Sequence, residues 1–196
     1  MPNLTKEAIN HIKASEGLRL KAYPDPGSKD GKPVTIGYGT TRINGNPIKL
    51  GTVITEKQAE AYLAADLQVF AKRVASLIKV KLSDNQFGAL VSFAYNIGLE
   101  AFKNSTLLRK LNAGDYKAVP IQMRRWNKND GKVMQGLINR RESEIRLWSK
   151  AGSAVEAPEK PTDGNKPPVG DSPSPERVTT LLSLLIAFIK LLLGRK

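Results

Sequence analysis

The stretch EGLRLKAYPDPGSKDGKPVTIGYGTT, residues 16–41, decides the fold and holds the first candidate reactive groups. Two β-prone runs flank a loop rich in proline and glycine, a pattern that predicts a β-hairpin. Glu16 precedes the first run, Asp25 lies between two prolines in the loop, and Thr35 lies in the second run. The hairpin therefore carries two acidic side chains and a hydroxyl group within a short length of chain.

Glu16 follows a segment, residues 5–15, that we expect to be helical. Gly17 is typical of the position just beyond a helix end, where the backbone turns left-handed. A carboxyl group at a helix C-terminus meets the negative end of the helix dipole, which disfavours its ionisation. A general acid must be protonated near neutral pH, so Glu16 is a candidate acid and Asp25 its candidate partner. A surface acid and a turn-forming aspartate explain the same spacing.

Two capping boxes predict further helices. Thr55 and Gln58 open a long helix with one apolar stripe, and Ser83 and Gln86 open a second helix. The second is so dense in apolar residues that we expect it to be the buried centre of a helical lobe.

These motifs resemble the phage-type lysozymes, the endolysins of glycoside hydrolase family 24. The resemblance begins with the acids and the run VTIGYG of residues 34–39, and it covers about residues 3–150. Further matching runs are DNQFGALVSFAYNIG at 84–98 and GLINRRE at 136–142. The resemblance implies an α+β, lysozyme-like fold: a mainly α-helical lobe with a small antiparallel β subdomain.

The implied function is hydrolysis of the β-1,4 bond between N-acetylmuramic acid and N-acetylglucosamine in bacterial peptidoglycan, which causes lysis of the host cell. Glu16 would protonate the leaving oxygen, and Asp25 with Thr35 would position or activate the attacking water. No metal or organic cofactor is implied, and the sole histidine, His11, offers no Ser-His-Asp or metal cluster. The alternatives are a lytic transglycosylase and a cationic protein that permeabilises membranes.

The resemblance also implies residues that bind the substrate. Asn96 would hydrogen-bond an N-acetyl group, and a helix C-cap is its alternative role. Trp126 would line the sugar site, although tryptophan more commonly serves packing. Arg140 would contact Glu16 within about 4 Å, whereas its sequence context is also typical of an exposed helix N-terminus.

Two features depart from the family pattern. Nine residues separate Asp25 from Thr35, where five are common, so Asp30 is an alternative acid. Thr40 replaces the histidine that usually follows the Gly-Tyr-Gly run. We expect this change to affect local hydrogen bonding more than chemistry.

The net charge of +13 over 196 residues belongs almost entirely to residues 1–150, which should attract a polyanion. No nucleic-acid-binding motif accompanies it, so cell-wall polymer or lipid is the expected partner, and no specific nucleic acid is expected. The chain is expected to be a monomer. It has no cysteine and begins without a signal-peptide pattern. We therefore expect it to stay in the host bacterial cytoplasm until release to the periplasm and cell wall.

Composition divides the chain into three parts. Residues 1–150 form the lysozyme-like domain, residues 151–177 form a proline-rich linker, and residues 178–196 form an amphipathic helix. The apolar part of this tail is about 24 Å long as a helix, shorter than the roughly 30 Å of a bilayer core. We therefore expect Val178–Lys196 to bind bacterial membrane lipid at its surface.

Overall fold

The computed structural model describes residues 2–24 and 30–150, and the predicted linker and tail lie outside that range. Among the described residues, no helix is both long and apolar enough to cross a membrane. The elements in chain order are α1 (Lys6–Glu16), β1 (Arg19–Pro24), β2 (Val34–Gly37), β3 (Arg42–Ile43), β4 (Asn46–Pro47), α2 (Glu56–Leu77), α3 (Asp84–Ile97), α4 (Leu99–Lys103), α5 (Thr106–Asn112), α6 (Ala118–Arg124), β5 (Lys128–Asn129), β6 (Lys132–Val133) and α7 (Gln135–Ser149).

Helix α1 begins and ends close to the predicted residues. The Thr5 side chain accepts a hydrogen bond from the backbone N–H of Ala8 and caps the start. Gly17 ends the helix with a φ of 72°, and its N–H bonds the carbonyl oxygen of Lys13. Glu16 is therefore the last helical residue rather than the first residue beyond the helix, because the left-handed turn falls on Gly17.

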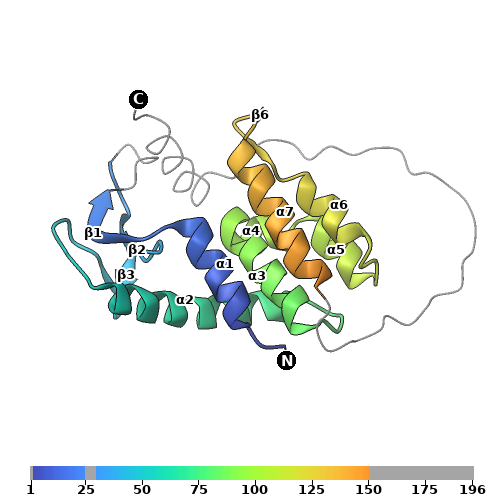
Figure 1. The fold of residues 1–196 in the computed structure, drawn as a ribbon, viewed down its shortest axis with the longest axis horizontal. Helices are drawn as coiled ribbons and strands as arrows, with labels where there is room; N and C mark the ends of the chain where they lie inside the picture. The colour runs from blue at the N-terminus through green and yellow to red at the C-terminus, as the bar shows by residue number, and fades with distance from the viewer. Residues whose placement is uncertain (1, 25–29, 151–196) are drawn as a thin grey trace, which may run out of the picture.

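The β subdomain consists of short antiparallel hairpins at one end of α2 (Figure 1). Strands β1 and β2 pair with Tyr23 opposite Thr35 and Pro24 opposite Val34, and the register is irregular nearer Arg19. The predicted hairpin is confirmed. Its first strand ends at Pro24, the residue before Asp25, and Asp25 itself lies outside the described residues.

Helix α2 runs from the β hairpins, beneath α1, to the helical lobe (Figure 1). Both predicted capping boxes are present, at Thr55–Gln58 and at Ser83–Gln86. The residues of α2 that are buried follow the predicted stripe: Ala59, Leu63, Leu67, Ala71 and Val74.

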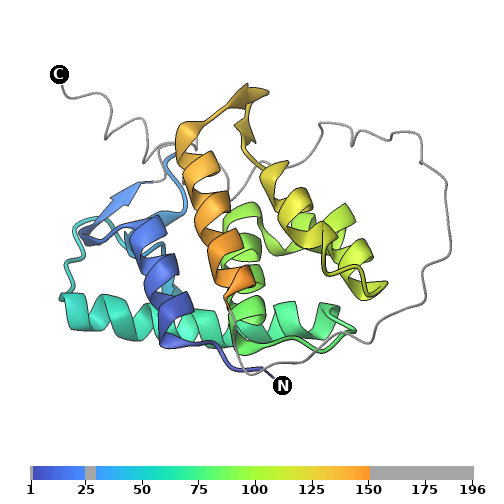
Figure 2. The same ribbon diagram turned by 45° about the vertical axis from the view of Figure 1, so that its right-hand side comes forward.

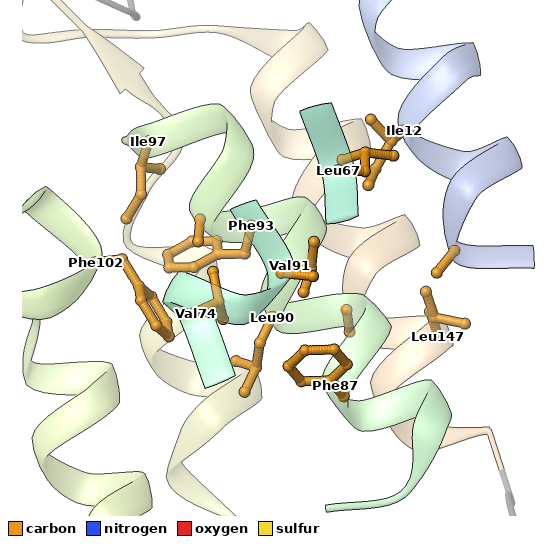
Figure 3. Close-up of a cluster of buried hydrophobic side chains, with 14 of the residues drawn as sticks. Ile12, Leu67, Val74, Phe87, Leu90, Val91, Phe93, Ile97, Phe102 and Leu147 are labelled. Carbon is orange, nitrogen blue, oxygen red and sulfur yellow. The ribbon is translucent and has the colours of Figure 1, made fainter. Parts of the chain in front are cut away.

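Helix α3 is the centre of the core, as its composition predicted. Figure 3 shows Phe87, Leu90, Val91 and Phe93 of this helix among apolar side chains from α1, α2 and α7. Gly88 permits α1 to approach closely, because a Cβ at this position would lie 2.5 Å from the Cβ of Ala8.

Helix α7 lies between α1 and α6, with α3 behind it (Figure 2). Helices dominate and the sheets are small and antiparallel, so the predicted α+β class is confirmed.

Candidate active site

The carboxyl group of Glu16 is held by an arginine from the other end of the domain. Arg140 Nη2 on α7 donates to Glu16 Oε1 at 2.9 Å, across 124 residues of sequence. The side chain of Glu16 is 14% exposed and that of Arg140 only 5%. The predicted contact between Glu16 and Arg140 is confirmed, and the expected alternative of a solvent-exposed Arg140 is wrong.

Arg140 has further partners on its inner side. Its Nε donates to Glu144 Oε1 at 3.3 Å, and its Nη2 also approaches the backbone oxygen of Ser92 at 3.4 Å. Burial acts to lower the pKa of Arg140, but the charges of Glu16 and Glu144 outweigh it and the pKa is raised. The guanidinium therefore stays charged beside Glu16.

Arg141 and Glu144 extend this arrangement into the core. Arg141 Nη2 donates to Glu144 Oε1 at 2.9 Å, and Arg141 Nε lies 2.7 Å from Glu144 Oε2. The guanidinium of Arg141 also lies over the ring of Phe93, 4.8 Å from its centroid. Burial lowers the pKa of Arg141 and Glu144 opposes this shift. Sequence reasoning missed both residues as parts of the site.

The spacing of Arg141 and Glu144 in the sequence indicated that both would be buried. Leu137, Arg141, Glu144 and Trp148 recur every three to four residues along α7, and all four are buried. A charged residue of each sign on an apolar stripe indicates a buried ion pair, because single charges are rarely buried without a partner.

His11 joins the same group of side chains from α1. Its Nδ1 lies 3.1 Å from Ser92 Oγ, which in turn donates to Glu144 Oε1 at 2.9 Å. Its Nε2 lies 2.6 Å from Ser143 Oγ. Burial lowers the pKa of His11. His11 is thus connected through Ser92 and Glu144 to Arg140 and Arg141. The sequence did not predict this placement.

The two other predicted substrate ligands face the core. Asn96 is buried, with 3% exposure, and its Oδ1 accepts from Arg141 Nη2 at 2.9 Å. The helix cap beside it is the backbone of Gly98, so the side chain of Asn96 does not serve as that cap. Trp126 is partly exposed and packs edge-on against Phe93, with ring centroids 5.9 Å apart. Contacts of Asn96 and Trp126 with a sugar stay predictions.

Thr35 lies on β2 with its side chain fully buried. Within residues 2–24 and 30–150, its Oγ1 has no hydrogen-bond partner. A buried hydroxyl without a partner is uncommon and needs a physical reason, such as a water or ligand that completes it. The structure does not test the pairing of Thr35 with Asp25, which falls outside the described residues.

Tyr95 lies within reach of the charges of both Glu16 and Asp66, and neither Tyr95 nor Asp66 was among the predicted site residues. Burial raises the pKa of Tyr95, and the negative charges of Glu16 and Asp66 raise it further. Thr40 Oγ1 donates to Asp66 Oδ2 at 2.9 Å, which joins the β subdomain to α2. Partial burial raises the pKa of Asp66 although this hydrogen bond opposes it. The hydroxyl of Thr40 thus takes part in local hydrogen bonding, as predicted.

No group of three acidic, histidine or cysteine side chains suited to hold a metal ion occurs in the described part of the chain. The groups that are present can donate and orient a proton: a carboxyl at a helix end, a fixed guanidinium beside it, and a buried hydroxyl on a neighbouring hairpin.

Comparison with known families identifies the group to which this arrangement belongs. The model of the phage lysozyme family matches residues 13–144, which include Glu16, Thr35 and Arg140. The chain belongs to the phage lysozyme family. The family predicted from the sequence motifs is thereby confirmed.

Individual members of the phage lysozyme family and solved structures agree. The endolysin of Bacillus phage B103 is 46% identical over 146 residues, which are 74% of this chain and 54% of that protein. The chain therefore spans about half the length of this relative. The endolysin of Escherichia coli O157:H7 phage FAHEc1 has a TM-score of 0.66 at 42% identity, covering 75% of this chain and 93% of that one. The muramidase domain of SpmX from Asticaccaulis excentricus has a TM-score of 0.69 at 35% identity, covering 77% and 100%. The predicted lysozyme-like fold is confirmed.

Proposed function

We propose that the protein is an endolysin that hydrolyses the β-1,4 bond between N-acetylmuramic acid and N-acetylglucosamine in bacterial peptidoglycan and so lyses the host cell. The observation that carries the proposal is the 2.9 Å contact between Arg140 Nη2 and Glu16 Oε1. It orients a carboxyl group at the end of α1 that is still 14% exposed. Membership of the phage lysozyme family supports the same substrate class.

In the proposed mechanism, Glu16 protonates the oxygen that leaves when the glycosidic bond breaks. Asp25 with Thr35 positions a water on the opposite face of the sugar ring, which gives inversion at the anomeric carbon. The Oγ1 of Thr35 is buried and has no hydrogen-bond partner among the described residues, which supports a role in holding that water. Trp126, which is partly exposed, is the predicted ligand best placed to touch a sugar, whereas Asn96 is only 3% exposed.

Analysis of the products from purified peptidoglycan tests this proposal. Hydrolysis yields reducing N-acetylmuramic acid ends in the mass spectrum, whereas 1,6-anhydro ends would indicate a lytic transglycosylase. E16Q is the matched control, because it keeps the shape of the side chain and removes the transferable proton. We expect it to lose 10²- to 10⁴-fold in turnover, the usual contribution of a general acid. Its melting temperature should fall, because Arg140 loses the charge of one of its two carboxylate partners, so turnover is compared at a temperature at which both proteins are folded.

The same variant separates the enzyme from a cationic membrane-permeabilising protein. Such a protein would lyse intact cells equally well with E16Q. Full lysis by E16Q, together with a parent that releases no reducing sugar, would contradict the proposed function.

We also propose that Val178–Lys196 is a membrane-binding tail, on the basis of its sequence. Its wide apolar face and terminal cations suit insertion into an anionic lipid surface. Removal of residues 176–196 should leave turnover on purified peptidoglycan nearly unchanged. It should abolish binding to anionic liposomes and weaken killing of intact Gram-negative cells. Equal killing by both proteins would contradict the proposal.

For its location we propose a monomer that stays in the host cytoplasm until another factor opens the inner membrane. The absence of cysteine from the whole sequence supports folding in a reducing compartment. Fractionation of infected cells before and after membrane depolarisation, with size-exclusion chromatography of the released protein, tests location and oligomeric state together.

A further inference from the structure

A buried charge cluster, formed by Arg140, Arg141 and Glu144, lies directly behind Glu16. The side chains of these three residues are 5%, 1% and 0% exposed. Two positive charges and one negative charge leave the cluster with one net positive charge facing Glu16. Buried charges are costly to desolvate, so the loss of one partner leaves the others uncompensated.

Glu144 is the residue that joins the cluster. Its Oε1 accepts from Arg140 Nε at 3.3 Å, from Arg141 Nη2 at 2.9 Å and from Ser92 Oγ at 2.9 Å. Arg140 is therefore fixed on two sides, with Nε on Glu144 and Nη2 on Glu16. Because a guanidinium group is planar and rigid, fixing Nε also fixes the direction in which Nη2 points.

The charge of Glu144 acts on Glu16 as well. Without it, two unbalanced arginines would stand behind Glu16, and nearby positive charge favours an ionised carboxylate. A general acid has to carry its proton when the substrate binds. Glu144 therefore offsets one of the two positive charges that stand behind Glu16.

We propose that Glu144 is a positioning residue for the general acid: it orients Arg140 toward Glu16 and balances the positive charge that Glu16 experiences. This inference rests on the proposed function, in which Glu16 donates the proton. It goes beyond that function because Glu144 is fully buried and cannot touch the substrate.

The E144Q variant tests the charge of Glu144 while keeping its shape. We expect kcat to fall about 10- to 100-fold, the range for a slightly misplaced catalytic group, with KM within about twofold of the parent, because the sugar contacts are unchanged. The pH dependence of kcat should also change, because the net positive charge that faces Glu16 rises by one. A folded E144Q with the parent's kcat and pH profile would overturn the proposal.

A second variant covers the case in which E144Q is too unstable to assay. The double variant E144M/R141M removes one charge of each sign, so the net charge facing Glu16 is the same as in the parent. Replacing a buried ion pair by apolar side chains of similar volume commonly preserves stability. We expect cooperative unfolding at a stability between those of the parent and E144Q, because Arg140 Nε, Asn96 Oδ1 and Ser92 Oγ each lose one partner. The kcat should still be about tenfold lower than that of the parent, because Arg140 has lost the anchor of its Nε.

The single variant R141M is the matched control, because it keeps the contact between Arg140 and Glu144. Its loss in kcat should be smaller than that of the double variant, and its pH profile should change in the direction opposite to that of E144Q, because the net positive charge that faces Glu16 falls by one. If the kcat of the double variant equals that of the parent, Glu144 serves only to balance the charge of Arg141. The proposal that Glu144 positions Arg140 is then wrong.

One readout does not depend on turnover. Hydrogen exchange of the Arg140 Nε–H, followed by NMR in the full chain without substrate, should be slow in the parent and in R141M and at least tenfold faster in E144M/R141M. Equal exchange rates in the parent and the double variant would overturn the positioning role. A parent that releases no reducing sugar would instead contradict the proposed function and leave this measurement intact.

Discussion

The two sides of the proposed site are built differently. On the helical side, Arg140 of α7 holds Glu16 of α1 in a contact of 2.9 Å between the two helices, and Glu144 holds Arg140 in a contact of 3.3 Å within α7. On the hairpin side, Thr35 lies on a two-stranded ladder with an irregular register, and its buried hydroxyl has no partner among the described residues. The acid is therefore oriented by an ion pair before substrate arrives, whereas no described residue orients the hydroxyl on the side that is proposed to hold water.

This difference has opposite consequences for stability. Removing one partner from a buried, paired cluster leaves a charge uncompensated, which destabilises the fold. Removing a buried hydroxyl that lacks a partner relieves a desolvation cost of about 1–3 kcal/mol. Substitutions on the two sides should therefore both reduce activity while changing stability in opposite directions.

The largest effect should come from R140M, which breaks the helical side. Glu144 then pairs only with Arg141, and Glu16 loses its ionic partner. We expect the free energy of unfolding to fall by about 3 kcal/mol and turnover to fall about 100-fold, measured by urea denaturation and by release of reducing sugar. R140K retains the charge but not the planar guanidinium group, so its free energy of unfolding and its turnover should lie between those of the parent and R140M. An R140M variant as stable as the parent would remove the contrast between the two sides.

A smaller effect of opposite sign should come from T35V on the hairpin side. Valine has nearly the same shape as threonine, so this variant should gain about 1 kcal/mol in stability by losing a hydroxyl for which the described residues supply no partner. Its turnover should fall, because the proposed water loses a hydrogen bond. The matched variant T35S keeps the hydroxyl and loses a methyl group. It should keep more of the turnover but lose about 1 kcal/mol of stability. If T35V is both less stable and fully active, the hydroxyl has a structural partner instead.

The smallest effect should be a change in how stability depends on pH, seen with H11Q. Burial lowers the pKa of His11; Glu144 opposes this, and Arg140, Arg141 and Arg146 add to it. The folded protein thus binds this proton less tightly than the unfolded chain, where histidine titrates near 6.5. The stability that His11 contributes is therefore present above pH 6.5 and is lost as the pH falls through the window below it.

The H11Q variant has no imidazole to protonate. When the pH is lowered from above 6.5 to below 6.5, its melting temperature should therefore fall less than that of the parent. Parallel curves for the two proteins would show that His11 plays no part in the acid sensitivity of the helical side.

Local signals in the sequence were enough to predict much of the fold. The capping boxes at Thr55–Gln58 and Ser83–Gln86 each start a helix at the expected residue, because their hydrogen bonds form within four residues. Helix α4 lacked such a signal, because it begins after Gly98 without a side-chain cap. Helix α6 has no capping box, although Asp115 Oδ1 accepts from the N–H of Ala118 in its first turn. Packing against α5 and α7 adds to this weak local signal.

The site was harder to predict for a physical reason. The contact between Glu16 and Arg140 joins residues 124 positions apart, and only the family resemblance indicated it. The burial of Arg141 and Glu144 depends on each being the other's partner. Either residue alone, although it lies on the apolar stripe of α7, is of a type that is usually exposed. Asp25 and the tail lie outside the described residues, so their predicted roles stay predictions.

The contact between Gly88 and Ala8 has a consequence for protein engineering. A glycine inside a helix is usually a good target for stabilisation, because alanine favours the helix by up to about 1 kcal/mol. At Gly88 the added methyl group would lie 2.5 Å from the Cβ of Ala8, so α1 would have to move away from α3. Glu16 lies on the same helix, about 12 Å further along its axis, and would move with it. A library designed for heat resistance should therefore keep Gly88 and Ala8 constant, because their spacing determines where the acid meets its arginine.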